Sequence, residues 1–242
     1  MPPPVAPQRP HRHETHGDVR LDDYYWMRDR DDPEVHAYLT AENAYLEERL
    51  GHTAQRQTAL FGEIKGRIKQ TDVSVPYRDG SHFYYYRYED GQEYRVYCRK
   101  PLDDDTETVL MDVNDLATGH EYCELGALGV SPDERLLAYA VDTVGRRQYD
   151  IRFRDLVTGQ DLPDTIPQVT SNFVWANDNQ TIFYARQHET TLRSHQVCRH
   201  RLGEEVSQDV LVFEEGDDTF GCGVGKSRSK RYILIGTYQT LT

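Results

Sequence analysis

The residues of this chain that could do hydrolytic chemistry are two serines that follow glycines. Residues 129–131 (GVS) and 225–227 (GKS) begin like the Gly-x-Ser-x-Gly turn that exposes the nucleophile of an α/β-hydrolase. Asp133 and Ser229 occupy the places where the second glycine belongs, and this sharp turn needs residues without a Cβ beside the serine. Ser131 is therefore expected to be an ordinary residue of a Ser-Pro-Asp turn, and no catalytic residue is predicted in this chain.

A phosphate-binding loop is suggested by residues 221–229, which read GCGVGKSRS and contain Gly-Lys-Ser. Such a loop also needs a glycine five residues before its second glycine, so that backbone amides can surround the phosphates. Phe220 occupies that place. A turn between two strands is the expected structure, and no cofactor is predicted.

Histidines and acidic residues are the remaining candidates for a metal site or for acid–base catalysis. The HRHETH stretch at 11–16 lacks the paired histidines of a helical zinc site and has no cysteine nearby, so no metal is predicted. Residues 103–105 and 214–218 are acidic runs in predicted loops, with no spacing that pairs an acid with a base. Solvated side chains are also expected for three later histidines: His188, His195 and His200.

Composition and charge exclude several classes of protein. The 242 residues carry a formal net charge of −13, which disfavours nucleic acid as a partner. There is neither an apolar run of about 18 residues to span a membrane nor the apolar segment of a secretory signal. A cytoplasmic location is the resulting expectation, and the four distant cysteines are expected to be reduced thiols.

The first part of the chain, residues 1–72, is expected to be a helical extension after an extended, proline-rich start. Asp32, Pro33 and Glu34 form a helix start signal, with Asp31 and Glu34 at capping-box spacing. Apolar residues then recur at three- and four-residue intervals until Gly51. A second helix is predicted for residues 53–69, weakened by two internal glycines at about 1 kcal/mol each.

Residues 73–242 show a repeat that predicts a β-propeller. A turn residue followed by an apolar strand recurs at Asp79, Asp133, Asp178 and Ser229, with separations of 54, 45 and 51 residues. Propeller blades of four strands repeat every 40 to 50 residues or so. A β-sandwich is the alternative, but it requires no constant internal offsets. The prediction is a mainly β chain with three blades and the start of a fourth, which begins at Arg231, in an incomplete ring. An incomplete ring leaves strand edges exposed, so we expect this chain to be the front part of a longer protein.

Four stretches of the sequence resemble a known family. They include RPHRHETHGDVRLDDYYWMRDRDDPEVHAYLTAENAY, EIKGRIKQTDVSVPYRDGSHFYYYRYEDGQEYRVYCRK, SPDERLLAYAVDTVGRRQYDIRFRDLVTG and WANDNQTIFY. Together they resemble the N-terminal part of enzymes of the oligopeptidase B type, in the prolyl oligopeptidase family of serine peptidases. The resemblance covers nearly the whole chain.

The resemblance implies a two-domain peptidase that cleaves short peptides after Arg or Lys. A seven-bladed propeller would gate access to a Ser-His-Asp site in a C-terminal α/β-hydrolase domain, which this chain lacks. The implied partners are short basic peptides and that hydrolase domain. Tyr24, Tyr25, Trp26 and the apolar stripe of the first helix would lie against the hydrolase domain or, alternatively, on the outer wall of the propeller. Two alternatives to a peptidase remain: a non-enzymatic propeller that binds partner proteins, and a free-standing chain of 242 residues that has lost its activity.

Overall fold

The computed structural model describes residues 2–241, which fall into two compact units. The first unit extends to Lys69 and the second begins at Gln70. The first contains a small hairpin and two helices, and the second is built almost entirely of antiparallel strands. Each unit is described by itself.

The first unit begins with a hairpin that the sequence did not predict. Strands β1 (His11–Thr15) and β2 (Asp18–Asp22) pair through a two-residue loop. The loop residues His16 and Gly17 have φ angles of 52° and 80°, the left-handed backbone that such tight turns require. Neither strand shows alternating apolar residues, so only an extended segment could be expected.

The aromatic residues that follow the hairpin find partners within the first unit. They lie in a short 3₁₀ helix, η1 (Tyr25–Arg28). The Trp26 indole N–H donates to the carbonyl of Pro7 at 2.9 Å, and the Arg9 guanidinium lies 4.5 Å from the centre of its ring. Tyr25 stacks on His11 with ring centres 4.0 Å apart. Tyr25 and Trp26 are therefore half-buried by residues of their own unit.

Two helices follow, joined by the 3₁₀ turn η2 (Gly51–Thr53): α1 (Pro33–Leu50) and α2 (Ala54–Gly66). The carboxylate of Asp32 accepts the N–H of Glu34 at 2.8 Å, so Asp32 caps α1 and Pro33 is its first residue, as the start signal predicted. The second helix ends at Gly66, three residues before the predicted end. No helix in residues 2–241 is long and apolar enough to cross a membrane.

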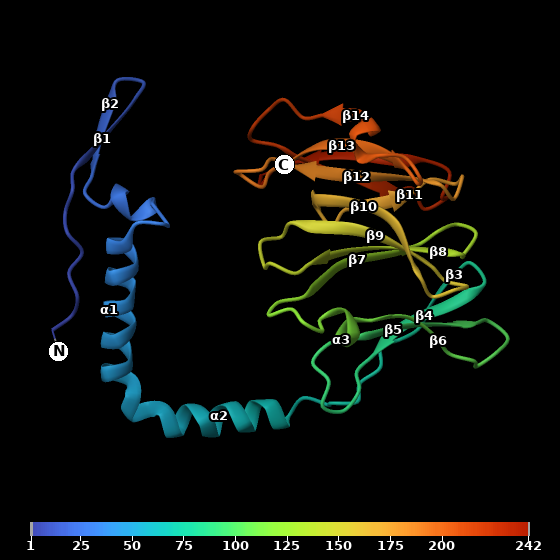
Figure 1. Ribbon diagram of the computed structural model, residues 1–242, viewed down its shortest axis with the longest axis horizontal. Coiled ribbons are helices and arrows are strands. Elements are labelled where there is room, and N and C mark those ends of the chain that lie inside the picture. Colours follow the sequence, from blue (N-terminus) through green and yellow to red (C-terminus); the bar gives the residue numbers. More distant parts are fainter. Residues whose placement is uncertain (1, 242) are drawn as a thin grey trace. The chain divides into compact units, whose positions relative to one another are not determined.

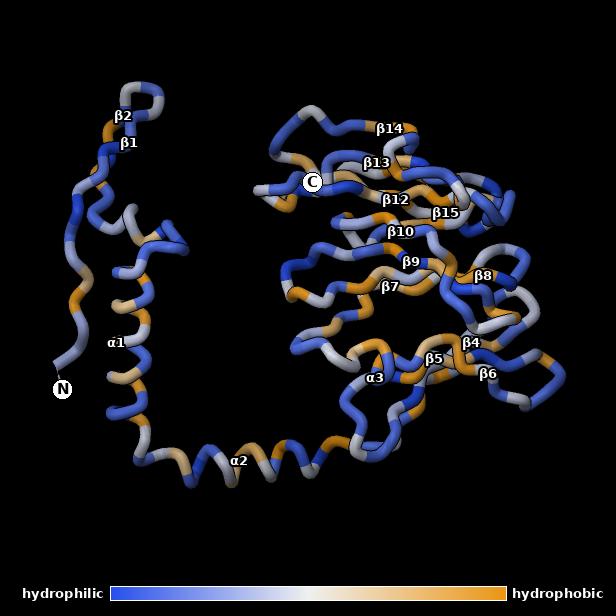
Figure 2. The backbone as a smooth tube through the Cα atoms, viewed as in Figure 1, coloured by the Kyte–Doolittle hydropathy of each residue, from blue (hydrophilic) through white to orange (hydrophobic). Residues whose placement is uncertain are grey.

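Both helices carry apolar side chains that the rest of their unit leaves uncovered. Hydrophobic residues recur along α1 and α2 (Figure 2). The largest of them are between 46% and 67% exposed: Leu39, Leu46 and Leu50 on α1, and Leu60, Phe61 and Ile64 on α2. We call these six residues the helical stripe.

The second unit consists of four successive antiparallel sheets, stacked one after another (Figure 1). The first sheet is blade 1, with β3 (Tyr77–Asp79), β4 (His82–Arg87), β5 (Val96–Pro101) and β6 (Thr108–Asp112). Blade 2 has β7 (Glu124–Val130), β8 (Leu136–Asp142), β9 (Tyr149–Asp155) and β10 (Asp161–Val169). Blade 3 has β11 (Phe173–Trp175), β12 (Thr181–Gln187), β13 (Ser194–Arg201) and β14 (Val210–Glu214). Blade 4 contributes β15 (Gly221–Lys226) and β16 (Ile233–Tyr238).

The mainly β, partial-propeller prediction is confirmed, with one correction in blade 4. The blade does not begin at Arg231 but at Gly221, because β15 is its first strand. The stretch 221–229 was expected to be a turn, whereas it is extended backbone as far as Lys226. Strand β15 reads GCGVGK, and so few apolar side chains do not produce the alternation by which strands are recognised in a sequence.

The core lies between neighbouring blades. Leu137, Tyr139 and Met111 fill the space between blades 1 and 2, and Phe153 and Tyr184 do so between blades 2 and 3. All five are almost fully buried, and burial of such a side chain stabilises the fold by about 1.5–3 kcal/mol. The four cysteines are free and also buried.

His200 contradicts the expectation of a solvated histidine. Its side chain on β13 is only 1% exposed, and Nδ1 lies 2.6 Å from a carboxylate oxygen of Asp209. The other oxygen of Asp209 accepts the hydroxyl of Tyr184 at 2.7 Å. Asp164 of blade 2 lies 3.8 Å from Nε2 of the imidazole. A buried polar cluster therefore joins blades 2 and 3.

Candidate functional site

Ser131 is a structural turn residue. Its hydroxyl donates to a carboxylate oxygen of Asp133 at 2.6 Å and accepts the N–H of Leu136 at 2.9 Å. The side chain is only 2% exposed. No histidine shares these contacts, so the hydroxyl has no base to activate it.

Lys226 does not belong to a phosphate-binding loop. It ends strand β15, and its ammonium group donates to the carbonyl of Trp175 at 2.8 Å. It thereby links blade 4 to blade 3. Its side chain is half-buried.

A metal site is not formed by the side chains in residues 2–241. No group of three or more histidine, cysteine, aspartate or glutamate residues there could hold an ion. His11 and His13 lie with ring centres 4.7 Å apart, but both rings pack against Tyr25.

Ser81, His82 and Glu134 bring together the residue types of a catalytic triad, a cluster that the sequence did not reveal. Both the Ser81 hydroxyl and a carboxylate oxygen of Glu134 lie 3.0 Å from Nδ1 of His82. A working triad uses one imidazole nitrogen for the nucleophile and the other for the carboxylate. Here the same nitrogen serves both, and the hydroxyl also donates directly to Glu134.

The cluster instead joins two blades. The backbone N–H of Ser81 in blade 1 donates to Glu134 of blade 2 at 2.7 Å. Burial opposes ionisation of this carboxyl, but the hydrogen bonds from Ser81 and the proximity of His82 hold the pKa of Glu134 below its usual range. Glu134 is thus an ionised clamp between the first turns of the two blades.

Similar contacts link the corresponding turns of the later blades. The N–H of Asp133 donates to the side-chain oxygen of Asn179 at 2.9 Å, joining blade 2 to blade 3. The Asn177 amide donates to the carbonyl of Lys230 at 2.9 Å, joining blade 3 to blade 4. Lys230 also forms an ion pair with Asp79 of blade 1. The turns after β3, β7, β11 and β15 are therefore held together at one end of the blades.

A cavity of about 470 Å³ lies among these turns and the first strands of all four blades. We call it the first-strand cavity. Tyr77, Phe173 and Trp175 supply aromatic lining, and charged side chains of both signs come from the turns. It is large enough to receive part of a peptide, since ligand pockets measure roughly 300–1,000 Å³. No single blade could form this cavity by itself, because its lining comes from all four.

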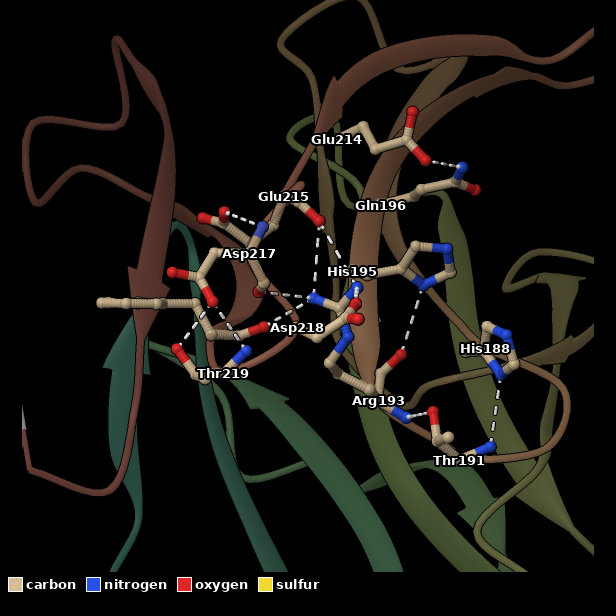
Figure 3. Close-up of polar contacts among 11 residues, drawn as sticks. His188, Thr191, Arg193, His195, Gln196, Glu214, Glu215, Asp217, Asp218 and Thr219 are labelled. Atoms are coloured by element: carbon tan, nitrogen blue, oxygen red, sulfur yellow. Dashed lines mark hydrogen bonds and ion pairs between the residues drawn. The ribbon is translucent and has the colours of Figure 1, made fainter. Parts of the chain in front are cut away.

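Arg193 organises an acidic loop elsewhere on the propeller (Figure 3). Its guanidinium donates to the carbonyls of Asp217 and Phe220 at 3.1 and 2.7 Å, and to that of Glu215 at 3.4 Å. It also pairs with the carboxylate of Asp218 at 3.1 Å. The side chains of Asp217 and Asp218 are exposed, as predicted, but their backbone is fastened to blade 3 where the chain passes into blade 4.

Comparison with known proteins decides the family. Residues 3–242 match the prolyl oligopeptidase N-terminal β-propeller domain. The chain belongs to the prolyl oligopeptidase family. It is 42% identical to dipeptidyl aminopeptidase BI of Pseudoxanthomonas mexicana over 99% of its length, and 37% identical to protease 2 of Moraxella lacunata over 96%. The resemblance predicted from the sequence is thereby confirmed.

Solved structures of the prolyl oligopeptidase family show the same fold. Oligopeptidase B from Leishmania major superposes with a TM-score of 0.90 at 31% identity, over 98% of this chain and 36% of that structure. The two curated relatives are covered over 36% and 35% of their lengths. The chain thus spans little more than a third of its relatives, and corresponds to their propeller portion.

Proposed function

We propose that this chain is the N-terminal propeller portion of a serine-type oligopeptidase that hydrolyses short peptides. The Ser-His-Asp site would lie in a C-terminal α/β-hydrolase domain of the longer protein, and the propeller would restrict access to it. The observation that carries the proposal is the family match over residues 3–242, together with relatives named as peptidases. Membership in this family favours a peptidase over a propeller scaffold.

The proposed specificity is endopeptidase cleavage after Arg or Lys. It is supported by the structural similarity to oligopeptidase B at a TM-score of 0.90. A second candidate is the release of N-terminal dipeptides, because a relative that is 42% identical is named a dipeptidyl aminopeptidase. We also propose a cytoplasmic location, for which the free cysteines are the support.

Peptide hydrolysis by the longer protein tests both specificities. The substrates are fluorogenic peptides that carry Arg, Lys or Ala before the scissile bond, each made with a blocked and with a free N-terminus. We expect kcat/KM to be about tenfold or more higher for Arg and Lys than for Ala, since a pocket that pairs the cation leaves an uncharged side chain without its partner. The 242-residue chain alone, which serves as the control, should be inactive. Cleavage confined to dipeptides at free N-termini would establish the second candidate instead.

The helical stripe is proposed to pack on the hydrolase domain. Most of the stability of a helix in a protein comes from packing of its apolar side, so a partner that covers this side of the 18-residue helix α1 should stabilise it. We expect backbone amides of residues 33–50 to exchange hydrogen at least about tenfold more slowly in the longer protein than in the isolated chain. Leu46→Glu should remove most of this difference, while the exposed control Glu47→Gln should preserve it. Equal protection in the two proteins would show that α1 needs no such partner.

A further inference from the structure

The first-strand cavity differs in charge from the rest of the molecule. The chain carries a formal net charge of −13. The charged residues that line the cavity nevertheless include three cations and only two carboxylates: Lys226, Arg228 and Lys230, with Asp79 and Glu134. The excess of positive charge in this lining is therefore opposite in sign to the charge of the whole chain.

The two carboxylates already have partners. Asp79 pairs with Lys230, and Glu134 accepts hydrogen bonds from Ser81. Their negative charge is therefore committed to holding the turns together. An additional positive charge remains in the lining.

Lys226 and Arg228 supply that charge. Among residues 2–241, the one hydrogen-bond acceptor of the Lys226 ammonium is the carbonyl oxygen of Trp175. Burial and the nearby charge of Lys230 lower the pKa of Lys226, and the charges of Asp79 and Asp178 oppose this only in part. Within residues 2–241, the structure gives Arg228 no hydrogen bond or ion pair. Both groups can therefore bind an anion without breaking an existing ion pair.

The rest of the lining suits a peptide. Tyr77 and Phe173 line the cavity with aromatic rings, and the backbone and polar side chains of the turns lie beside them. Aromatic walls with a few polar groups are typical of sites that hold small organic ligands. A peptide carries a carboxylate at its C-terminus and in acidic side chains, and cations beside a partly buried surface bind such a group with charge-assisted hydrogen bonds.

We propose that the first-strand cavity is a binding subsite for a carboxylate of the peptide substrate, held by Lys226 and Arg228. This inference rests on the proposed peptidase function and extends it. The subsite would select peptides that present an anionic group to the propeller, while the hydrolase domain recognises the residue at the cleavage point.

The test compares three otherwise identical ten-residue peptides as substrates of the longer protein. One ends in a free carboxylate, one in an amide, and one in an amide after a C-terminal glutamate. Either carboxylate-bearing peptide should have a KM about tenfold below that of the plain amide, the effect of roughly one hydrogen bond to a charged group. The two arms distinguish a terminal from a side-chain carboxylate. A short chromogenic substrate without a carboxylate reports the basal activity.

Variants assign the effect to the cavity. Lys226→Met and Arg228→Gln should each reduce the preference for a carboxylate while leaving kcat on the short substrate unchanged. Arg228→Gln guards against a folding defect, because the Arg228 side chain is exposed and has no hydrogen bond or ion pair in the described part of the chain. The matched control is Arg231→Gln, which lies outside the lining, with its guanidinium 6.0 Å from the Tyr232 ring.

The outcomes separate the subsite from the proposed function. A wild-type protein that cleaves all three peptides equally, or variants that retain the preference, would overturn the subsite and leave the peptidase function standing. If no peptide is cleaved, the peptidase function fails. Calorimetric titration with the same peptides then decides the subsite by itself: tighter binding of a carboxylate-bearing peptide supports it, and equal binding overturns it.

Discussion

His200→Ala is expected to lower the free energy of unfolding of blade 3 by about 3–5 kcal/mol, because it leaves a buried carboxylate without its partner. The side chains of His200 and Asp209 are 1% and 2% exposed, and their polar atoms lie 2.6 Å apart. Tyr184 is the other hydrogen-bond donor to Asp209. The Tyr184 hydroxyl alone cannot stabilise the charge of the buried Asp209 carboxylate, which His200 helps to stabilise in the wild-type protein.

The same cluster makes the stability of blade 3 depend on pH. Burial favours neutral His200, but the hydrogen bond and charge of Asp209, aided by Asp164, outweigh it and raise the pKa of His200 above its ordinary value of 6.5. The other ionisable groups around the pair are Tyr184, Arg186 and Cys198. A histidine whose pKa is higher in the folded state stabilises the fold fully when the pH is below its unfolded-state pKa. This stabilisation is lost as the pH rises through its folded-state pKa. Stability should therefore fall from mildly acidic toward alkaline pH, and His200→Ala should lack this dependence.

Native-state hydrogen exchange of strands β12 to β14 measures both effects in the intact longer protein, because it reports the opening of an individual blade. His120→Ala is the matched control, since His120 is exposed and only its backbone N–H forms a hydrogen bond. A loss below about 1 kcal/mol would show that Asp209 finds another partner or water.

The sequence predicts the turns of the propeller blades but not the buried cluster around His200. The turns at Asp79, Asp133 and Asp178 were recognised because each belongs to a hairpin whose residues are neighbours in the chain. His200 was misjudged because residues that help to bury it, Phe153 and Asp164, come from another blade. One local signal was available: alternation along β13 places His200 on the same face as the buried Cys198.

The candidate site was beyond prediction for the same reason. The Ser81–Glu134 clamp joins residues 53 positions apart, and the pair formed by Asp79 and Lys230 joins residues 151 apart. Short motifs could exclude a catalytic serine or a phosphate loop, because those functions need fixed local spacing. A cavity made by four blades has no fixed spacing, so only the fold reveals it.

Gly126→Val should destabilise the propeller by about 3 kcal/mol, the upper end of the usual cost of overpacking. Gly126 lies in β7 beside a shift in the pairing register with β8. A Cβ there would come within 2.4 Å of the Tyr149 ring and 2.7 Å of the Ser171 side chain. The ring of Tyr149 is buried, and burial together with a hydrogen bond to Glu124 raises its pKa to about 12. The ring therefore has little room to move away.

Gly225→Val is the matched control for this substitution. Gly225 also lies in a strand, β15, but an added Cβ would have no atom within 4 Å. Valine is favoured in strands, so this variant should be neutral or slightly stabilising. Urea denaturation of the two variants of the longer protein gives the comparison. Equal stability would mean that Tyr149 and Ser171 can move away from β7 by the width of a methyl group without loss of packing. The expected difference would show that close approach of the Gly126 backbone fixes their positions.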